Sequence, residues 1–189
     1  MKKARKSAKA SQAKERIVKF VKKKKNRKIL REGRFLSLDP SSGSTSSMPG
    51  YAIFENGKLL EAGILELSVG KELNFRLQEL GHLLRTEFQN VELVIVEDVP
   101  AIPIYTQKQA MAKGKTFMTT KQVASLQKSA GLCIGSFHPD IPTIRVSPLT
   151  WSAYKRNYDW QVEKNDTNDA VIMGMTVLQI LNELEEKEE

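Results

Sequence analysis

The chain has 189 residues, of which 40% are hydrophobic, as expected for one globular domain with a buried core. No stretch approaches the roughly 18 consecutive apolar residues that a membrane-spanning helix needs, so we expect no transmembrane segment and no membrane partner. The single cysteine, Cys133, excludes an intramolecular disulfide, and no secretory signal is evident. These features predict a reducing, cytoplasmic location, with Cys133 as a small buried apolar side chain rather than a nucleophile.

The net charge of +8 is distributed unevenly along the chain. Residues 1–34 contain 16 of the 30 lysines and arginines but only two acidic residues, whereas the rest of the chain carries 14 basic and 20 acidic side chains. Like charges repel, and such a segment has little apolar area to offset chain entropy. We therefore expect a flexible basic tail over residues 1–33 and a folded domain over residues 34–189.

The basic segment favours a polyanionic partner. Lysines that neutralise the phosphates of a nucleic acid release counterions, which favours binding, and an anionic membrane surface attracts the same kind of segment. A solvated tail that only improves solubility is the third interpretation. We favour nucleic acid and expect DNA contacts from four consecutive lysines, Lys22, Lys23, Lys24 and Lys25.

Three strands are expected directly after the basic segment. Residues 34–39 form an apolar run that ends on Asp39, before Pro40 stops a strand. After a loop, two more apolar runs cover residues 51–54 and 58–67. The pair Asn56-Gly57 lies between them and is the strongest short signal for a β-hairpin.

Helices and strands alternate over the rest of the chain. Apolar residues between positions 72 and 88 recur at helical spacing, whereas residues 91–96 are almost continuously apolar, as in a strand buried on both faces. The polar residues 105–118 are expected to be a mobile or DNA-facing connection. The remaining elements are a helix over 119–130 that ends at Gly131, a strand over 143–146 and a long helix over 166–186.

This order predicts an α/β fold of the ribonuclease-H-like arrangement. Its mixed five-stranded sheet has three antiparallel strands first, then parallel strands joined through helices that flank the sheet. A fold hosts many functions, so the functional prediction depends on the site residues.

Four carboxylates stand at the ends of these elements. Asp39 and Glu97 each end a strand, and Asp166 and Asp169 begin the last helix, three residues apart on one face. Such hard oxygen ligands suit two Mg²⁺ ions, with Mn²⁺ as a possible substitute. A pair of these ions about 3.5 to 4 Å apart can activate water and stabilise a leaving oxygen, which predicts phosphodiester hydrolysis.

Each acid also has a purely structural interpretation. Asp39-Pro40 is a common way to open a turn, and residues 166–169 form a plausible helix cap. Asp98 and Glu163 are nearby alternatives. Since side chains of a strand alternate in direction, Glu97 and Asp98 cannot both face the site.

The motifs resemble those of RuvC-like Holliday junction resolvases, especially the phage type. Residues 35–42, Phe-Leu-Ser-Leu-Asp-Pro-Ser-Ser, resemble the opening of that family, residues 94–97 its second acidic strand, and residues 166–170 its closing acidic helix. The resemblance extends from residue 34 to about 182. The stretch after Asp39 is longer than the family pattern, and the basic segment lies outside it.

The resemblance implies a metal-dependent endonuclease. Its ligands would be Asp39, Glu97, Asp166 and Asp169, holding two Mg²⁺ ions per site without a small-molecule cofactor. A homodimer would nick opposed strands of a four-way DNA junction symmetrically, in a bacterial cytoplasm if the protein is phage-encoded. Nucleases for flaps, other branched DNA or RNA-DNA hybrids, and a non-catalytic DNA-binding relative, remain alternatives.

Two further pairs of residues are expected to contact DNA. Ser41 and Ser42 could hold a phosphate through hydroxyls and backbone amides, although their loop has the composition of a flexible connection. Lys155 and Arg156 could stabilise charge that develops on the scissile phosphate, or could lie on a surface helix with no such role.

Overall fold

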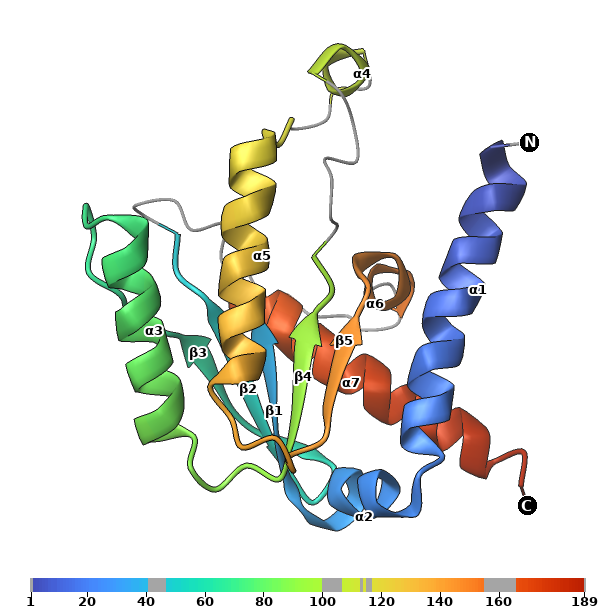
Figure 1. Cartoon of the computed structure of the whole chain (residues 1–189). Helices are drawn as coiled ribbons and strands as arrows, with labels where there is room; N and C mark the ends of the chain where they lie inside the picture. The colour runs from blue at the N-terminus through green and yellow to red at the C-terminus, as the bar shows by residue number, and fades with distance from the viewer. Residues whose placement is uncertain are drawn as a thin grey trace.

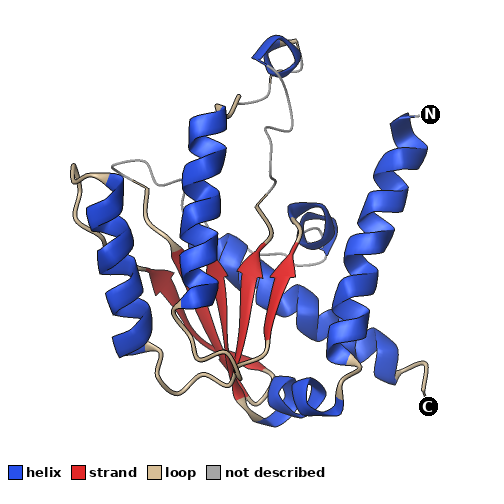
Figure 2. Cartoon of the chain, in the orientation of Figure 1, coloured by secondary structure: helices blue, strands red, loops and turns tan. Residues whose placement is uncertain are grey.

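A mixed five-stranded sheet forms the centre of the fold, with the strand order β3-β2-β1-β4-β5 (Figures 1 and 2). In this computed structural model the described residues are 2–40, 47–99, 107–112, 114, 117–154 and 166–188, with the side chains of 2–10 and 166 left aside. The strands are β1 (Arg34–Asp39), β2 (Gly50–Glu55), β3 (Lys58–Ile64), β4 (Leu93–Glu97) and β5 (Thr143–Val146).

The pairing of the strands confirms the expected α/β architecture. β1 is antiparallel to β2, and β2 to β3, whereas β4 is parallel to both β1 and β5. Asn56 and Gly57 take positive φ angles of 52° and 71° between β2 and β3, as a two-residue type I′ hairpin requires. β3 ends at Ile64, three residues before the predicted end of that strand.

Helices cover both faces of the sheet. On one face, α7 and the N-terminal helices share an apolar cluster with Phe35 and Ile95. On the other, α3 and α5 share a cluster with Leu36 and Val94. The helices are α1 (Lys2–Val21), α2 (Lys24–Glu32), α3 (Leu73–Glu87), α4 (Gln107–Met111), α5 (Thr120–Gly135), α6 (Pro148–Tyr154) and α7 (Asp166–Glu185).

Two predicted boundaries differ from the structure around α5. The helix begins as expected, because the side chain of Thr119 accepts a hydrogen bond from Gln122 N at 3.2 Å and the Gln122 side chain accepts one from Thr119 N at 2.8 Å. It continues through Gly131 to Gly135, because Gly131 does not adopt the positive φ angle with which a glycine ends a helix. The preceding connection contains the short helix α4, which the sequence did not predict.

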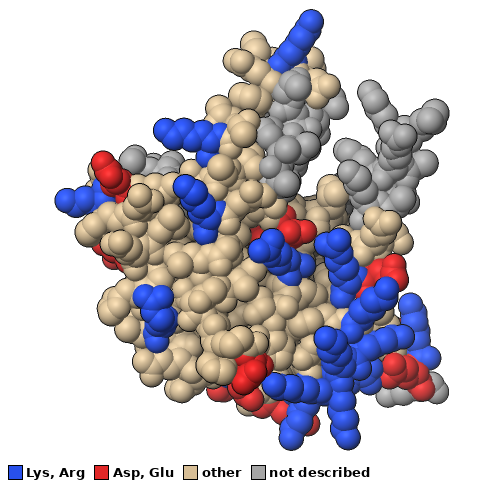
Figure 3. Space-filling view, viewed as in Figure 1, with Lys and Arg blue, Asp and Glu red and all other residues tan. Residues whose placement is uncertain are grey.

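The prediction of a flexible tail over residues 1–33 is wrong for the described part of that segment. α1 and α2 lie against the domain, with Ile17, Val21, Ile29 and Leu30 at most 7% exposed in the same cluster as α7. Ile17 and Val21 are four residues apart and so share one helix face. The sequence prediction weighed the mean charge of the segment and so overlooked these apolar positions. Lys and Arg side chains gather at the lower right of Figure 3.

Ion pairs join the basic helices to the end of α7. Lys14 Nζ lies 2.8 Å from Glu183 Oε2, and Arg27 Nη1 lies 2.8 Å from Glu188 Oε2. Arg31 pairs with Glu185. The hydrogen bond to Glu183 raises the pKa of Lys14, and the bond from Arg27 lowers the pKa of Glu188. These pairs are partly exposed, so they orient the helices more than they stabilise them.

None of the described helices is long and apolar enough to cross a membrane.

Replacing Leu30 with alanine tests whether α2 is an integral part of the fold. Leu30 is fully buried, so Leu30→Ala should lower the free energy of unfolding by about 2 to 5 kcal/mol. Lys22→Ala, at an exposed position, should change it by less than about 0.5 kcal/mol. Urea denaturation followed by circular dichroism measures both. Equal stability of Leu30→Ala and the wild type would show that α2 does not pack on the core.

Candidate active site

Asp39 and Glu97 lie side by side at the carboxyl ends of two neighbouring strands. The parallel register of β1 and β4 pairs Leu38 with Val96, and the two acids are the next residue on each strand. Neighbouring strands are about 5 Å apart, so the two carboxylates are within reach of a common ligand. The register of the sheet therefore produces the first pair of the predicted site.

Both acids lie on the face of the sheet that α7 covers. Side chains alternate along a strand, so Asp39 shares a face with Phe35 on β1, and Glu97 shares a face with Ile95 on β4. Phe35 and Ile95 belong to the cluster that contains the buried residues of α7. Asp98, the alternative acid, follows on the opposite face, and its backbone N–H donates to Val146 O at 2.9 Å.

α7 brings a third predicted acid to this region. Its first turns lie behind the arrowheads of β1 and β4 in Figure 1, and the helix contacts both strands. Asp169 is half-buried and stands four residues before Met173, so it begins the stripe that packs on the sheet. The N-terminus of a helix favours negative charge, which suits an acid in this first turn.

A glycine of α7 determines how closely the helix approaches the sheet. A Cβ atom at Gly174 would lie 2.3 Å from Cε2 of Phe54, well inside the contact distance. Phe54 stacks on Phe35 with ring centroids 4.7 Å apart, so its ring has no free space behind it. Gly174 therefore allows α7 to lie directly on β2.

The described carboxylates fit Mg²⁺ or Mn²⁺ by chemistry but do not by themselves complete a metal site. Asp39 and Glu97 offer only hard oxygen ligands, which magnesium and manganese prefer. Within the described ranges, however, no group of three His, Cys, Asp or Glu side chains is arranged to hold a metal ion. The side chain of Asp166, the fourth predicted ligand, lies outside the described residues.

Several predicted DNA contacts also lie outside the described residues. Ser41 and Ser42 follow β1, and Lys155 and Arg156 follow α6, and their predicted roles stay predictions. The four predicted lysines from Lys22 to Lys25 are exposed around the α1–α2 turn. Lys25 Nζ donates to the carbonyl of Asp140 at 3.4 Å.

Sequence reasoning overlooked one polar residue of this region, Asn168. It is only 8% exposed in the first turn of α7, directly before Asp169. An amide so deeply buried needs hydrogen-bond partners, and it therefore fixes how the first turn is seated. The sequence signal was its place between two acids, Asp166 and Asp169, at the start of the predicted last helix.

Cys133 is a buried structural thiol, as the sequence predicted. The side chain of this α5 residue is fully buried among apolar neighbours. Burial raises its pKa to about 12, and the negative charge of Asp39 contributes to the same shift. A thiol in this environment is not a nucleophile at neutral pH.

Comparisons with known proteins support the fold. No protein-family model and no curated protein sequence matches this chain. Among solved structures, T. thermophilus RuvC in complex with a Holliday junction substrate is similar, with a TM-score of 0.55 and 12% sequence identity. The alignment covers 76% of this chain and 90% of that chain. The chain therefore has the ribonuclease-H-like fold found in RuvC.

The thiol of Cys133 should be almost unreactive in the native protein. At pH 8 a thiol with a pKa of about 12 is ionised about a thousandfold less than an exposed one. We expect dithionitrobenzoate to react at least that much more slowly with the native protein than with the protein unfolded in guanidinium chloride. Rapid labelling of Cys133 in the native protein would contradict the buried position of this side chain on α5.

Proposed function

We propose that this protein is a metal-dependent endonuclease that resolves four-way DNA junctions by paired, symmetric nicks. The observation that carries the proposal is the adjacency of Asp39 and Glu97 on neighbouring parallel strands of a fold similar to RuvC. The similar structure contains a Holliday junction substrate, which supports branched DNA as the substrate class.

The role of the acids follows from their chemistry. Asp39 and Glu97, with Asp166 and Asp169 of α7, would hold two Mg²⁺ ions. When bound, these ions would supply an activated water and stabilise the leaving oxygen. Asp39 is only 7% exposed, and a carboxylate so far removed from water is costly unless a cation or hydrogen-bond donors neutralise it. The acids themselves would orient the scissile phosphate, because their positions would determine where the cations lie.

A homodimer would match the symmetry of the substrate. A four-way junction has two equivalent strands to cut, and a two-fold dimer carries two identical sites related by the same symmetry. Lys155 and Arg156 are proposed to stabilise the charge on the scissile phosphate, and Ser41 and Ser42 to hold the neighbouring backbone.

Cleavage of a synthetic four-way junction is the direct test. With Mg²⁺, the purified protein should introduce one nick in each of two opposed strands, visible as paired products on a denaturing gel. EDTA should abolish the products. Cleavage restricted to flaps or RNA-DNA hybrids would replace the junction assignment with one of those substrates, and binding without cleavage would indicate a non-catalytic relative.

Asp39→Asn removes a proposed ligand charge without changing the size of the side chain. We expect cleavage to fall by at least about 100-fold while junction binding in EDTA is retained. The rise in Tm on adding Mn²⁺ should also be lost, because an ion that binds only the folded state stabilises it.

Asp98→Asn is the matched control, since Asp98 is the neighbouring carboxylate on the opposite face of β4. It should retain both cleavage and the Mn²⁺-dependent rise in Tm. If Asp98→Asn rather than Asp39→Asn abolished both, the acids would face the other side of the sheet and the proposed site would be wrong.

A further inference from the structure

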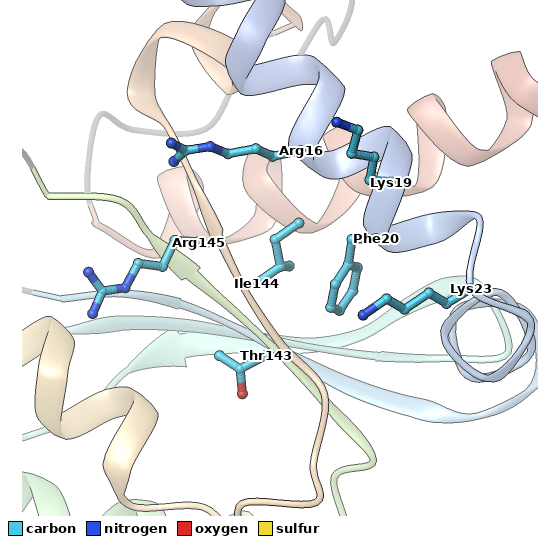
Figure 4. A pocket seen from close by; sticks show the side chains of 7 residues that line it. All are labelled: Arg16, Lys19, Phe20, Lys23, Thr143, Ile144 and Arg145. Carbon is cyan, nitrogen blue, oxygen red and sulfur yellow. The ribbon is translucent and has the colours of Figure 1, made fainter.

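A groove lies between α1 and the edge strand β5, outside the acidic region (Figure 4). Its volume is about 370 Å³. Arg16, Lys19 and Lys23 line it from the α1–α2 segment, and Arg145 lines it from β5. Phe20 and Ile144 provide its apolar part, between these cations.

The groove has a strongly positive lining. No acidic residue is among the described residues that line it. Lys19 pairs with Glu15 on the exposed side of α1, at 2.9 Å. In the part of the chain that the structure describes, no ion pair joins Arg16, Lys23 or Arg145 to a carboxylate.

This lining contrasts with the other side of the basic helices. There Lys14, Arg27 and Arg31 each pair with a glutamate near the end of α7. The segment thus has one neutralised side that holds it to the domain and one side whose exposed cations line the groove. This lining favours an anionic ligand.

The volume of the groove and its apolar residues indicate which class of anion it could bind. The volume is that of a site for a small molecule or one nucleotide. Half-buried Phe20 presents an aromatic ring beside cations, the combination by which proteins bind single-stranded nucleic acid without reading its sequence. An acidic peptide would use the cations but gain little from the ring.

We propose that the α1–β5 groove binds a single strand of nucleic acid, with its phosphates on Arg16, Lys23 and Arg145 and a base against Phe20. Arg145 directly precedes Val146, which is paired with Glu97, so the groove borders the strand next to the one that ends on Glu97. This binding requires neither metal nor cleavage. It goes beyond the proposed function by giving an unpaired strand of branched DNA its own site.

Charge removal tests the phosphate contacts. The full chain is titrated in EDTA with a fluorescein-labelled 20-nucleotide oligo-dT, and anisotropy is followed at several salt concentrations. The triple variant Arg16→Gln, Lys23→Gln, Arg145→Gln should bind about tenfold more weakly. It should also lower the slope of log affinity against log salt by about 2, because each lost single-strand phosphate contact removes about 0.7.

The matched control removes the same charge elsewhere. Lys58→Gln, Lys71→Gln, Lys128→Gln replaces three exposed lysines on β3, the β3–α3 loop and α5, none of which lines the groove. Its affinity for the oligonucleotide should stay within about twofold of that of the wild type. Its salt slope should differ from the wild-type slope by less than about 0.5. Equal losses in the two triple variants would overturn the proposal in favour of diffuse attraction by net charge.

Phe20→Leu tests stacking separately from charge. Leucine keeps an apolar side chain but removes the aromatic face, so affinity for the single strand should fall roughly fivefold with the salt slope unchanged. Phe75→Leu, at a 46% exposed aromatic position on α3, should have no effect on binding. A Tm close to that of the wild type would show that Phe20→Leu remains folded.

Two competitors decide the class of ligand. A 20-base-pair duplex should bind more weakly than the single strand and should be insensitive to Phe20→Leu. An acidic peptide of glutamates should compete poorly. Duplex binding with the same sensitivity to Phe20, or strong competition by the peptide, would contradict the single-strand assignment. Because the assay contains no metal, its failure leaves the proposed nuclease untouched, and a failure of junction cleavage leaves the groove untouched.

Discussion

The parallel pairing of β1 with β4 is the contact on which the candidate site depends. It buries both strands on both faces, and the same register sets Asp39 beside Glu97 at the carboxyl end. A shift of one residue would turn one acid to the opposite face and bring every apolar side chain of that strand to the wrong layer. The packing of the core and the position of the acids therefore depend on the same register.

Charge is arranged in two separate regions of the molecule. Asp39 and Glu97 lie side by side at the ends of β1 and β4, whereas lysines and arginines concentrate on α1, α2 and the β5 edge. The basic helices are attached by apolar contacts as well as by ion pairs, with Leu30 and Val21 fully buried. A polyanion can therefore bind their outer side while the buried apolar contacts continue to hold the helices to the domain.

Periodic patterns in the sequence predicted much of the fold, and the predictions that were wrong have identifiable causes. β1 and β5 have the predicted bounds, and the Asn56-Gly57 hairpin is confirmed, because local turn chemistry and apolar runs determine these elements. The prediction missed the basic helices because it was based on the mean charge of residues 1–33 and gave too little weight to the four apolar residues that are buried. Glu97 could be assigned to the strand end from sequence, but its face could not, since that depends on register. The groove could not be predicted from the sequence, because Arg145 and the α1 residues that line it are more than 100 residues apart in the chain.

The contact between Gly174 and Phe54 determines how far the acid on α7 lies from the acids on the sheet. Because Gly174 has no side chain, α7, which carries Asp169, can pack directly on the sheet that carries Asp39. The ring of Phe54 cannot move aside, because it is stacked on Phe35. A side chain at position 174 would push α7 away from β2 and so displace Asp169. The position of Asp169 thus depends on the absence of one side-chain carbon at Gly174, about one and a half helical turns further along α7.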